Sequence, residues 1–402
     1  MLSERSTRTI RATLPAVGAA IDEIAAVFYT KLFAAHPELE RDLFNRGNQA
    51  SGAQRQALAG SIAAFASALI THPDVRPDTM LSRIAHKHAS LGITRDQYEI
   101  VRTHLFAALA DVLGAAVTEE VAAAWDEVYW LMADALIAIE ERLYAQAGAP
   151  HGDTWRDYRV LARFHETGDV VSFLVHPADG APLPPFRPGQ YVSVQVQLSD
   201  GSRQIRQYSL SGGRAAALQF TVKKINGKPD GAVSHHLHHH VHDGDTLRLS
   251  APFGDITLDD RDTPVLLASA GIGCTPMNAM LTQLAATGSR RQVIAVHADR
   301  SQRSHAFRTE LDQLVAKLPN ATAHVWYERP EGPWPADRTG LIDLSTVPVP
   351  PETTAYLCGP LPFLRTARSQ LLERGVRAAD IHYEVFGPDL WIGQPDNRTK
   401  RS

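Results

Sequence analysis

The pattern of apolar and polar positions changes character twice along the chain. Up to about residue 147, Ala- and Leu-rich stretches repeat apolar residues every three to four positions, which is typical of amphipathic helices. From about 153, short Val-rich runs with alternating apolar residues are separated by Gly and Pro, which predicts strands. From about 264, apolar strands alternate with helical stretches, which predicts a parallel sheet. The sequence therefore predicts an all-α domain at 1–147, an antiparallel β-barrel domain at 153–260 and an α/β domain at 261–390. A flexible tail is expected at 391–402.

Five helices are expected in the first domain. The first ends before Pro37, because a residue ahead of proline is pushed out of helical dihedrals. Thr94 is a suitable N-cap for the fourth. The five are expected at Ile21–Phe33, after Ser51, around His88, after Thr94 and from Glu119 to Tyr144.

Strands of the third domain are expected wherever short apolar runs end in a glycine turn or precede a helical stretch. They lie at Val265–Ala268, Val293–Val296, Val325–Tyr327 and Ala355–Cys358. The stretch Gln146–Gly152 has the Gly and Pro content of a domain joint.

Composition limits the class of protein. Of the 402 residues, 44% are hydrophobic and 21% charged, which are ordinary values for a globular protein. A net charge of −4 gives no case for nucleic acid or an anionic membrane. The two cysteines, Cys274 and Cys358, fit a reducing compartment. No apolar run reaches the about 18 residues of a membrane span, so we expect a cytoplasmic protein.

His88 is the polar member of an apolar helix stripe formed with Leu81, Ile84 and Leu91. One interpretation is the axial ligand of a haem iron. The alternative is a core histidine with a hydrogen-bonding partner, which this stretch by itself favours.

Three further polar residues lie on apolar faces of the helical domain, namely Tyr29, Gln54 and Glu140. A buried polar group costs about 1–3 kcal/mol unless it is hydrogen-bonded. A haem pocket would supply partners for all three.

The second domain carries Arg206-Gln207-Tyr208-Ser209. An arginine can bind a diphosphate, a tyrosine can stack on a flat ring and a serine can reach a ring nitrogen. After Lys223, a glycine turn opens a short helix at Val233-Ser234, whose free amides suit a phosphate. The alternative is a plain six-stranded barrel.

In the third domain, Val265–Ala268 runs into Gly271-Ile272-Gly273, with Pro276 in the first helical turn. This pattern suits a dinucleotide phosphate, although Pro276 replaces the third glycine of the full fingerprint. Cys358-Gly359-Pro360 ends a later strand, at the edge where such sheets bind ligands. The alternative is a tight strand–helix turn.

Several of the eighteen histidines gather between His235 and His242. A metal site and a His-rich polar helix end are both compatible with this run. We favour the helix end, because a consecutive run does not supply a closed ligand geometry.

Taken in order, these motifs resemble the flavohaemoglobin family, the bacterial and fungal nitric oxide dioxygenases, from about residue 10 to Pro388. The globin part is similar in Phe28-Tyr29, His36–Leu39, Gln54-Arg55, Lys87-His88, Tyr98 and Glu140. The reductase part is similar in Pro188–Tyr191, Arg206–Ser209, Ser269–Gly273, Cys358–Pro360 and Glu384–Pro388.

The resemblance implies roles for individual residues around haem b. His88 would be the proximal iron ligand, with Glu140 and Tyr98 hydrogen-bonded around it. On the distal side, Tyr29 would donate to iron-bound oxygen beside Gln54. Leu58 would crowd the binding site and Phe44 would pack on the haem.

The resemblance also implies roles in the reductase part. Phe386 would lie near the flavin ring on the nicotinamide side. The residues implied to bind FAD or NAD(P)H are Tyr191, Arg206, Gln207, Tyr208, Ser209, Lys223, Val233, Ser234, Gly271, Gly273, Thr275, Pro276, Cys358, Gly359, Pro360, Glu384 and Phe386.

The implied activity is nitric oxide dioxygenation. NAD(P)H reduces FAD, FAD reduces haem, and ferrous haem with bound oxygen converts nitric oxide to nitrate. Two alternatives are a haem-based oxygen or nitric oxide sensor with a resetting reductase, and a flavin-dependent ferric or quinone reductase with a vestigial globin. We expect a monomer whose partners are nitric oxide, oxygen and NAD(P)H, with lipid as a further candidate in the haem pocket and no nucleic acid or obligate protein partner.

The sequence departs from the family at Cys274, where a glutamine is common. Cys274 is either a tolerated small residue, which we favour, or a redox-sensitive thiol. NADH and NADPH are not distinguished, because Arg300 and Arg303 suit a 2′-phosphate while Asp299 suits a free ribose hydroxyl.

Overall fold

The computed structural model describes residues 2–50, 52–75, 77–214 and 217–387. Its contacts divide the chain into two units. The first contains Met1–Thr154, Ser199–Ile205 and Gly387–Ser402, and the second contains Trp155–Leu198 and Arg206–Phe386. The predicted flexible tail at 391–402 lies outside the described residues.

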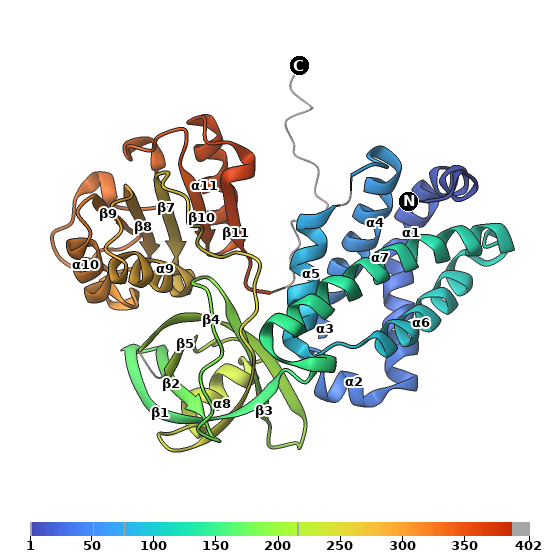
Figure 1. Ribbon diagram of the computed structural model, residues 1–402, viewed down its shortest axis with the longest axis horizontal. Helices are drawn as coiled ribbons and strands as arrows, with labels where there is room; N and C mark the ends of the chain where they lie inside the picture. The colour runs from blue at the N-terminus through green and yellow to red at the C-terminus, as the bar shows by residue number, and fades with distance from the viewer. Residues whose placement is uncertain (1, 51, 76, 215–216, 388–402) are drawn as a thin grey trace. The chain divides into compact units, whose positions relative to one another are not determined.

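The first unit is helical, as predicted (Figure 1). Its helices are α1 Glu4–Ala35, α2 Pro37–Asp42, α3 Arg46–Ala50, α4 Ala53–Thr71, α5 Asp78–Leu91, α6 Arg95–Leu113 and α7 Glu119–Ala147. Their apolar faces enclose one core, in which Phe28, Leu81 and Trp125 are buried.

The sequence placed the start of α1 too late, at Ile21. The helix begins after Ser3, whose hydroxyl accepts a hydrogen bond from Ser6 N and so caps the first turn. Ile10 and Val17 are buried, and this burial keeps the chain helical through Pro15. The predicted end before Pro37 is confirmed.

Helix α1 is also long and apolar enough to cross a membrane by length and composition. The prediction of no membrane span is not overturned by this test. The test is weak evidence, because a core helix of a globular domain passes it too. Ile24, Phe28 and Leu32 on α1 are buried in the helical core, which favours that interpretation.

The barrel of the second unit is closed and antiparallel, with strand order β1-β2-β5-β4-β3-β6. Its elements are β1 Trp155–Thr167, β2 Val170–Pro177, β3 Tyr191–Gln197, β4 Arg203–Arg214, β5 Ala217–Lys223, α8 Ala232–His240 and β6 Thr246–Ser250. Alternate residues point inward, and the rings of Phe173 and Phe220 stack at 5.2 Å in the core.

The α/β part of the second unit is a parallel sheet of order β11-β10-β7-β8-β9. Its elements are β7 Val265–Ala270, α9 Cys274–Ala286, β8 Val293–Asp299, α10 Arg308–Lys317, β9 Ala321–Tyr327, β10 Thr354–Cys358, α11 Leu361–Glu373 and β11 Ile381–Glu384. The sequence did not predict β11. The order reverses between β7 and β10, and such a reversal opens a ligand crevice at the carboxyl ends of the strands.

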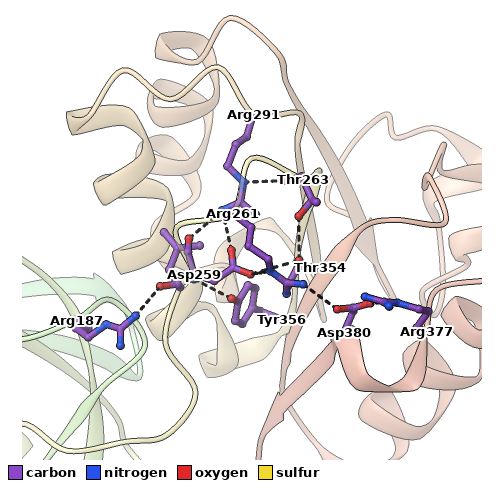
Figure 2. Close-up of polar contacts among 10 residues, drawn as sticks. Arg187, Asp259, Arg261, Thr263, Arg291, Thr354, Tyr356, Arg377 and Asp380 are labelled. Carbon is purple, nitrogen blue, oxygen red and sulfur yellow. Dashed lines mark hydrogen bonds and ion pairs between the residues drawn. The ribbon is translucent and has the colours of Figure 1, made fainter.

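A network of charged side chains fixes the connection that enters this sheet from the barrel (Figure 2). The buried Arg291 donates to the backbone oxygens of Thr263 and Asp259, at 2.8 and 3.0 Å. Arg261 bridges the carboxylates of Asp259 and Asp380. These contacts lie at the amino ends of β7 and β10. They therefore leave the carboxyl ends of the strands, where such sheets bind ligands, available for a ligand.

Candidate functional site

His88, Tyr98 and Glu140 form one hydrogen-bonded group in the helical unit. His88 Nδ1 lies 2.8 Å from Glu140 Oε1, and the Tyr98 hydroxyl donates to the same oxygen at 2.6 Å. The Tyr98 hydroxyl is also 2.9 Å from His88 Nδ1. The hydrogen bond that the family resemblance implied between His88 and Glu140 is therefore present.

Local sequence explains how these side chains meet. Gly92 ends α5 with a φ of 77°, a conformation that favours glycine, directly after the turn that carries His88. Thr94 and Gln97 then form a reciprocal capping box, as the N-cap prediction required, and Tyr98 follows in the first turn of α6. Glu140 reaches both from α7 and is only 2% exposed.

The electrostatics of this group suit an iron ligand. Burial, followed by the charge of Glu140, raises the pKa of Tyr98, so its phenol stays a donor. A carboxylate that accepts from Nδ1 fixes the imidazole tautomer and leaves Nε2 available to a metal. The His88 side chain is 31% exposed although its partner carboxylate is buried. The donor set therefore fits a haem iron at His88.

Tyr29 and Gln54 are the second polar pair of the helical unit. The Tyr29 ring is buried on α1, and its hydroxyl hydrogen-bonds to the Gln54 side chain on α4. Burial raises the pKa of Tyr29 to about 12, and the bond to Gln54 lowers it in part. The phenol therefore stays protonated and can donate.

Apolar residues surround this pair. The Phe44 ring meets Tyr29 edge-on at 5.7 Å, and Phe33 lies 5.5 Å from the same ring. Leu58, one turn after Gln54, is half-buried against the helical core. The structure thus brings Tyr29, Gln54 and Phe44 together, as the sequence analysis expected.

In the barrel, the predicted FAD residues lie on β4 and at the start of β3. Tyr208 stacks on Phe220 at 5.8 Å, and Ser209 is buried beside it. Gln207 Nε2 donates to Ser193 Oγ at 2.8 Å. The backbone of Tyr191 is fixed by a 2.7 Å bond from its amide to Phe253 O. Gln207 and Tyr208 are adjacent on β4 and therefore point to opposite faces of the strand.

Two cations belong to the same predicted set, namely Arg206 on β4 and Lys223 at the end of β5. Burial lowers the pKa of Arg206, so this guanidinium lies in a poorly solvated place that an anion would stabilise. Lys223, at the end of β5, lies 3.9 Å from the Asp169 carboxylate. Both positions are compatible with a diphosphate ligand.

At the start of α8, Val233 and Ser234 are buried. The Ser234 hydroxyl accepts from Ile225 N at 3.1 Å and donates to Gly231 O at 2.9 Å. This hydroxyl therefore fixes the turn, and the amides of the first helical turn remain the groups suited to a phosphate.

The predicted dinucleotide turn lies at the reversal of strand order. Gly271 adopts a φ of 53°, and Gly273 packs directly on the end of β10, where an added Cβ would overlap the Cys358 carbonyl. Gly359 in turn leaves only 3.1 Å between its Cβ position and Ala270 N. The two motifs, Gly271–Gly273 and Cys358–Pro360, are thus in contact.

The remaining residues predicted on the nicotinamide side lie near the carboxyl ends of the strands of this sheet or at the start of α9. Thr275 Oγ1 donates to Ile272 O at 3.0 Å, and Pro276 is buried in the first turn of α9. Glu384 pairs in register with Cys358 on the neighbouring strand. Phe386 follows β11 and its side chain is 46% exposed.

The two thiols are buried. Burial raises the pKa of Cys274 and of Cys358, so little thiolate forms at neutral pH. For Cys274 this favours a tolerated small residue over a redox-sensitive thiol.

The sequence analysis missed Asn278. Its side-chain amide is buried on α9 and donates to Ser211 O on β4 at 2.9 Å. This bond connects the helix that begins at the dinucleotide turn to the strand that carries Tyr208 and Ser209. No sequence signal identified it, because its partner is a backbone carbonyl.

The loop after β8 has its arginines paired. Arg303 forms two bonds with the Glu331 carboxylate, at 3.1 and 3.2 Å, while Arg300 lies 3.6 Å from Asp169. Asp299 is buried and accepts from Ser304 Oγ at 2.6 Å. Among the described residues, no group of three or more His, Cys, Asp or Glu side chains could hold a metal ion.

Known proteins similar to this chain cover nearly all of it. Residues 26–136 match the globin family and residues 267–369 match the oxidoreductase NAD-binding domain. The flavohemoprotein of Chromobacterium violaceum is 42% identical over 96% of this chain and 98% of its own. The flavohemoglobin of Malassezia yamatoensis, solved with bound FAD and heme, superposes with a TM-score of 0.89 at 37% identity, over 96% of this chain and all 100% of that one. The FAD/NAD-binding domain of nitric oxide dioxygenase from Vibrio cholerae is 38% identical over 58% of this chain and 100% of that one, with a TM-score of 0.54.

Proposed function

The chain belongs to the flavohaemoprotein family, and we propose that it is a nitric oxide dioxygenase that converts nitric oxide and oxygen to nitrate. It is an NAD(P)H-dependent oxidoreductase that uses haem and FAD. Its likeness to a domain of a nitric oxide dioxygenase supports the finer assignment. A cytoplasmic location, a monomeric state and lipid in the haem pocket stay predictions.

The single observation that carries the proposal is the bond between His88 Nδ1 and the buried Glu140 carboxylate, at 2.8 Å. An anionic acceptor on Nδ1 makes the imidazole a stronger electron donor to iron. Strong donation favours the activation of oxygen over its storage. An oxygen carrier or a vestigial globin has no need of this carboxylate.

When bound, NAD(P)H and FAD supply the electrons and haem supplies the oxygen chemistry. The protein's own residues bind and orient. His88 would hold the iron through Nε2, Glu140 fixes that imidazole, and Tyr98 keeps its proton and fixes Glu140. The Tyr29 phenol would keep its proton and donate a hydrogen bond to a ligand in the distal pocket, while Gln54 orients the Tyr29 hydroxyl.

In the second unit, Arg206 and the first turn of α8 would bind the FAD diphosphate, and Tyr208 and Ser209 would orient the ring. The glycine turn between β7 and α9 would let the protein backbone approach the NAD(P)H phosphates closely. Asn278 on α9 holds that turn at a fixed distance from β4, the strand that carries Tyr208 and Ser209.

The function is tested by mixing the anaerobic, NADH-reduced holoenzyme with oxygen and nitric oxide while nitrate and the haem spectrum are followed. We expect nitrate in proportion to the nitric oxide consumed. A His88→Ala variant should keep NADH oxidation by an artificial dye but lose nitrate formation, because only the iron site is removed. Dye reduction without nitrate formation in the unaltered protein would favour the reductase alternative.

A Glu140→Gln variant should weaken electron donation by His88, because a neutral amide replaces the anionic acceptor at 2.8 Å. We expect a lower Fe–His stretching frequency and nitrate formation slowed about tenfold, the usual scale for loss of such a ligand partner. Resonance Raman spectra of the reduced protein give the frequency directly.

The control is Glu141→Gln, since Glu141 is the exposed neighbour of Glu140 on the same helix. It should leave the frequency unchanged. If Glu140→Gln also leaves it unchanged, Glu140 supports the fold and does not tune the iron.

The sensor and vestigial-globin alternatives find less support. A vestigial pocket has no reason to keep both the Tyr29–Gln54 bond and the His88–Glu140–Tyr98 group. A sensor with a resetting reductase remains separable by rate, because it predicts slow turnover in the nitrate assay.

A further inference from the structure

Helix α8 carries two pairs of histidines spaced four residues apart, a feature that electron transfer to haem does not use. His235 pairs with His239 and His236 pairs with His240. Side chains four apart lie on the same helix face, and the zinc motif His-Glu-x-x-His uses this spacing to bind one metal from one helix. The two pairs differ in ways that decide between them.

The His236 and His240 rings have the separation that a shared metal ion requires. Their centroids are 5.3 Å apart. Two imidazole nitrogens at about 2 Å from one tetrahedral ion place their ring centroids about 5 Å apart. Within the part of the chain that the structure describes, neither ring has a hydrogen bond or ion pair, so their nitrogens remain available.

The other pair is less suited. Its centroids are 5.8 Å apart, and His235 Nε2 already lies 3.1 Å from Ile225 O. The positive charge of Lys224 acts on His239, where it would also repel a metal cation. His238 is not a candidate ligand, because it is buried with Nε2 bonded to Val222 O at 3.0 Å.

The helix that presents His236 and His240 is held firmly. Leu237 is fully buried in the barrel core, and His238 ties α8 to β5. The helix therefore fixes the backbone positions of both histidines one turn apart before any ion arrives, which reduces the entropy lost on binding.

We propose that His236 and His240 form a two-imidazole chelate site for a divalent transition-metal ion, namely Cu(II), Ni(II) or Zn(II). Water completes the coordination, because the structure places no third protein ligand there among the residues it describes. Imidazole is a preferred ligand of these ions, and Cu(II) should bind most tightly of the three. The site is separate from the haem iron and does not depend on the proposed reaction.

The test uses the untagged, oxidised holoenzyme without NAD(P)H. Titration with Cu(II) is followed by electron paramagnetic resonance, and titration with Zn(II) by competition with a chromogenic chelator. We expect one ion per chain, with a Cu(II) spectrum split by two imidazole nitrogens. His236→Ala and His240→Ala should each weaken binding about 100-fold, because the second ligand no longer binds intramolecularly.

The matched controls are His235→Ala and His239→Ala on the same helix, which should keep the affinity of the unaltered protein. Flavin content and the haem band show whether each variant is folded. If an alanine variant does not fold, His236→Asn is tested in its place. The proposal is overturned if no ion binds stoichiometrically, or if the control variants lose the ion and His236→Ala and His240→Ala keep it.

Discussion

Replacing Tyr29 by phenylalanine should make oxygen leave the reduced protein about 100-fold faster, since a hydrogen bond to a strongly polarised ligand contributes about 1.5–3 kcal/mol. Tyr29 is the buried donor of the distal pair, and its pKa of about 12 keeps the proton on the phenol. Phenylalanine preserves the ring contacts with Phe33 and Phe44. The change therefore removes the donor while the packing stays.

Stopped-flow displacement of oxygen from the reduced protein measures the rate directly, and nitric oxide consumption should fall with oxygen retention. The matched control is Tyr144→Phe, because Tyr144 is another buried tyrosine of the helical unit, and its hydroxyl donates to a backbone carbonyl, Ile93 O, at 2.6 Å. That variant should release oxygen at the normal rate. Equal rates for Tyr29→Phe and the unaltered protein would remove Tyr29 from the distal role.

Gln54 gives a second measurement of the same pair. Since Gln54 hydrogen-bonds to Tyr29, Gln54→Leu should speed oxygen release less than Tyr29→Phe does. The double variant should then differ little from Tyr29→Phe by itself, because residues that act through one contact are not additive.

The fold followed from the sequence where a long stretch shows one periodicity. Helices α4 and α7 were predicted near their observed bounds, because each presents several apolar turns to the core. The start of α1 was missed because its first turns are polar and Pro15 interrupts the pattern, while the burial of Ile10 and Val17 depends on other helices. Strand β11 has only four residues and forms because β10 pairs with it, which no local pattern encodes.

The candidate site divides in the same way. His88 and Glu140 lie 52 positions apart. The sequence pattern showed that each is a polar residue on an apolar face that requires a partner, but only the family resemblance implied that they pair with each other. Asn278 could not be predicted, since its partner is the carbonyl of Ser211, which has no side-chain signature. The hydrogen bonds of the Ser234 hydroxyl within its own turn could not be predicted either, because both partners, Ile225 N and Gly231 O, are backbone atoms.

The glycine turn between β7 and α9 provides the second large effect. Gly273→Ala should slow flavin reduction by NADH about 100-fold, since overpacking against rigid backbone costs about 1–3 kcal/mol or displaces the chain. The added Cβ would overlap the carbonyl group of Cys358 and approach Gly359 N to 2.9 Å. Neither backbone group can rotate away, so the turn and the end of β10 must separate at the point where the strand order reverses.

The measurement is stopped-flow reduction of the flavin by NADH, with chemical reduction of the haem by dithionite as a reference that bypasses the turn. Gly288→Ala is the control at the other end of α9. Its φ of 61° is strained for alanine by about 1–2 kcal/mol, but nothing lies within 4 Å of the new Cβ. That variant should lower the melting temperature slightly and reduce its flavin normally. A Gly273→Ala protein that retains FAD and accepts electrons from NADH at the normal rate would show that the dinucleotide does not depend on the close approach of β7 and β10.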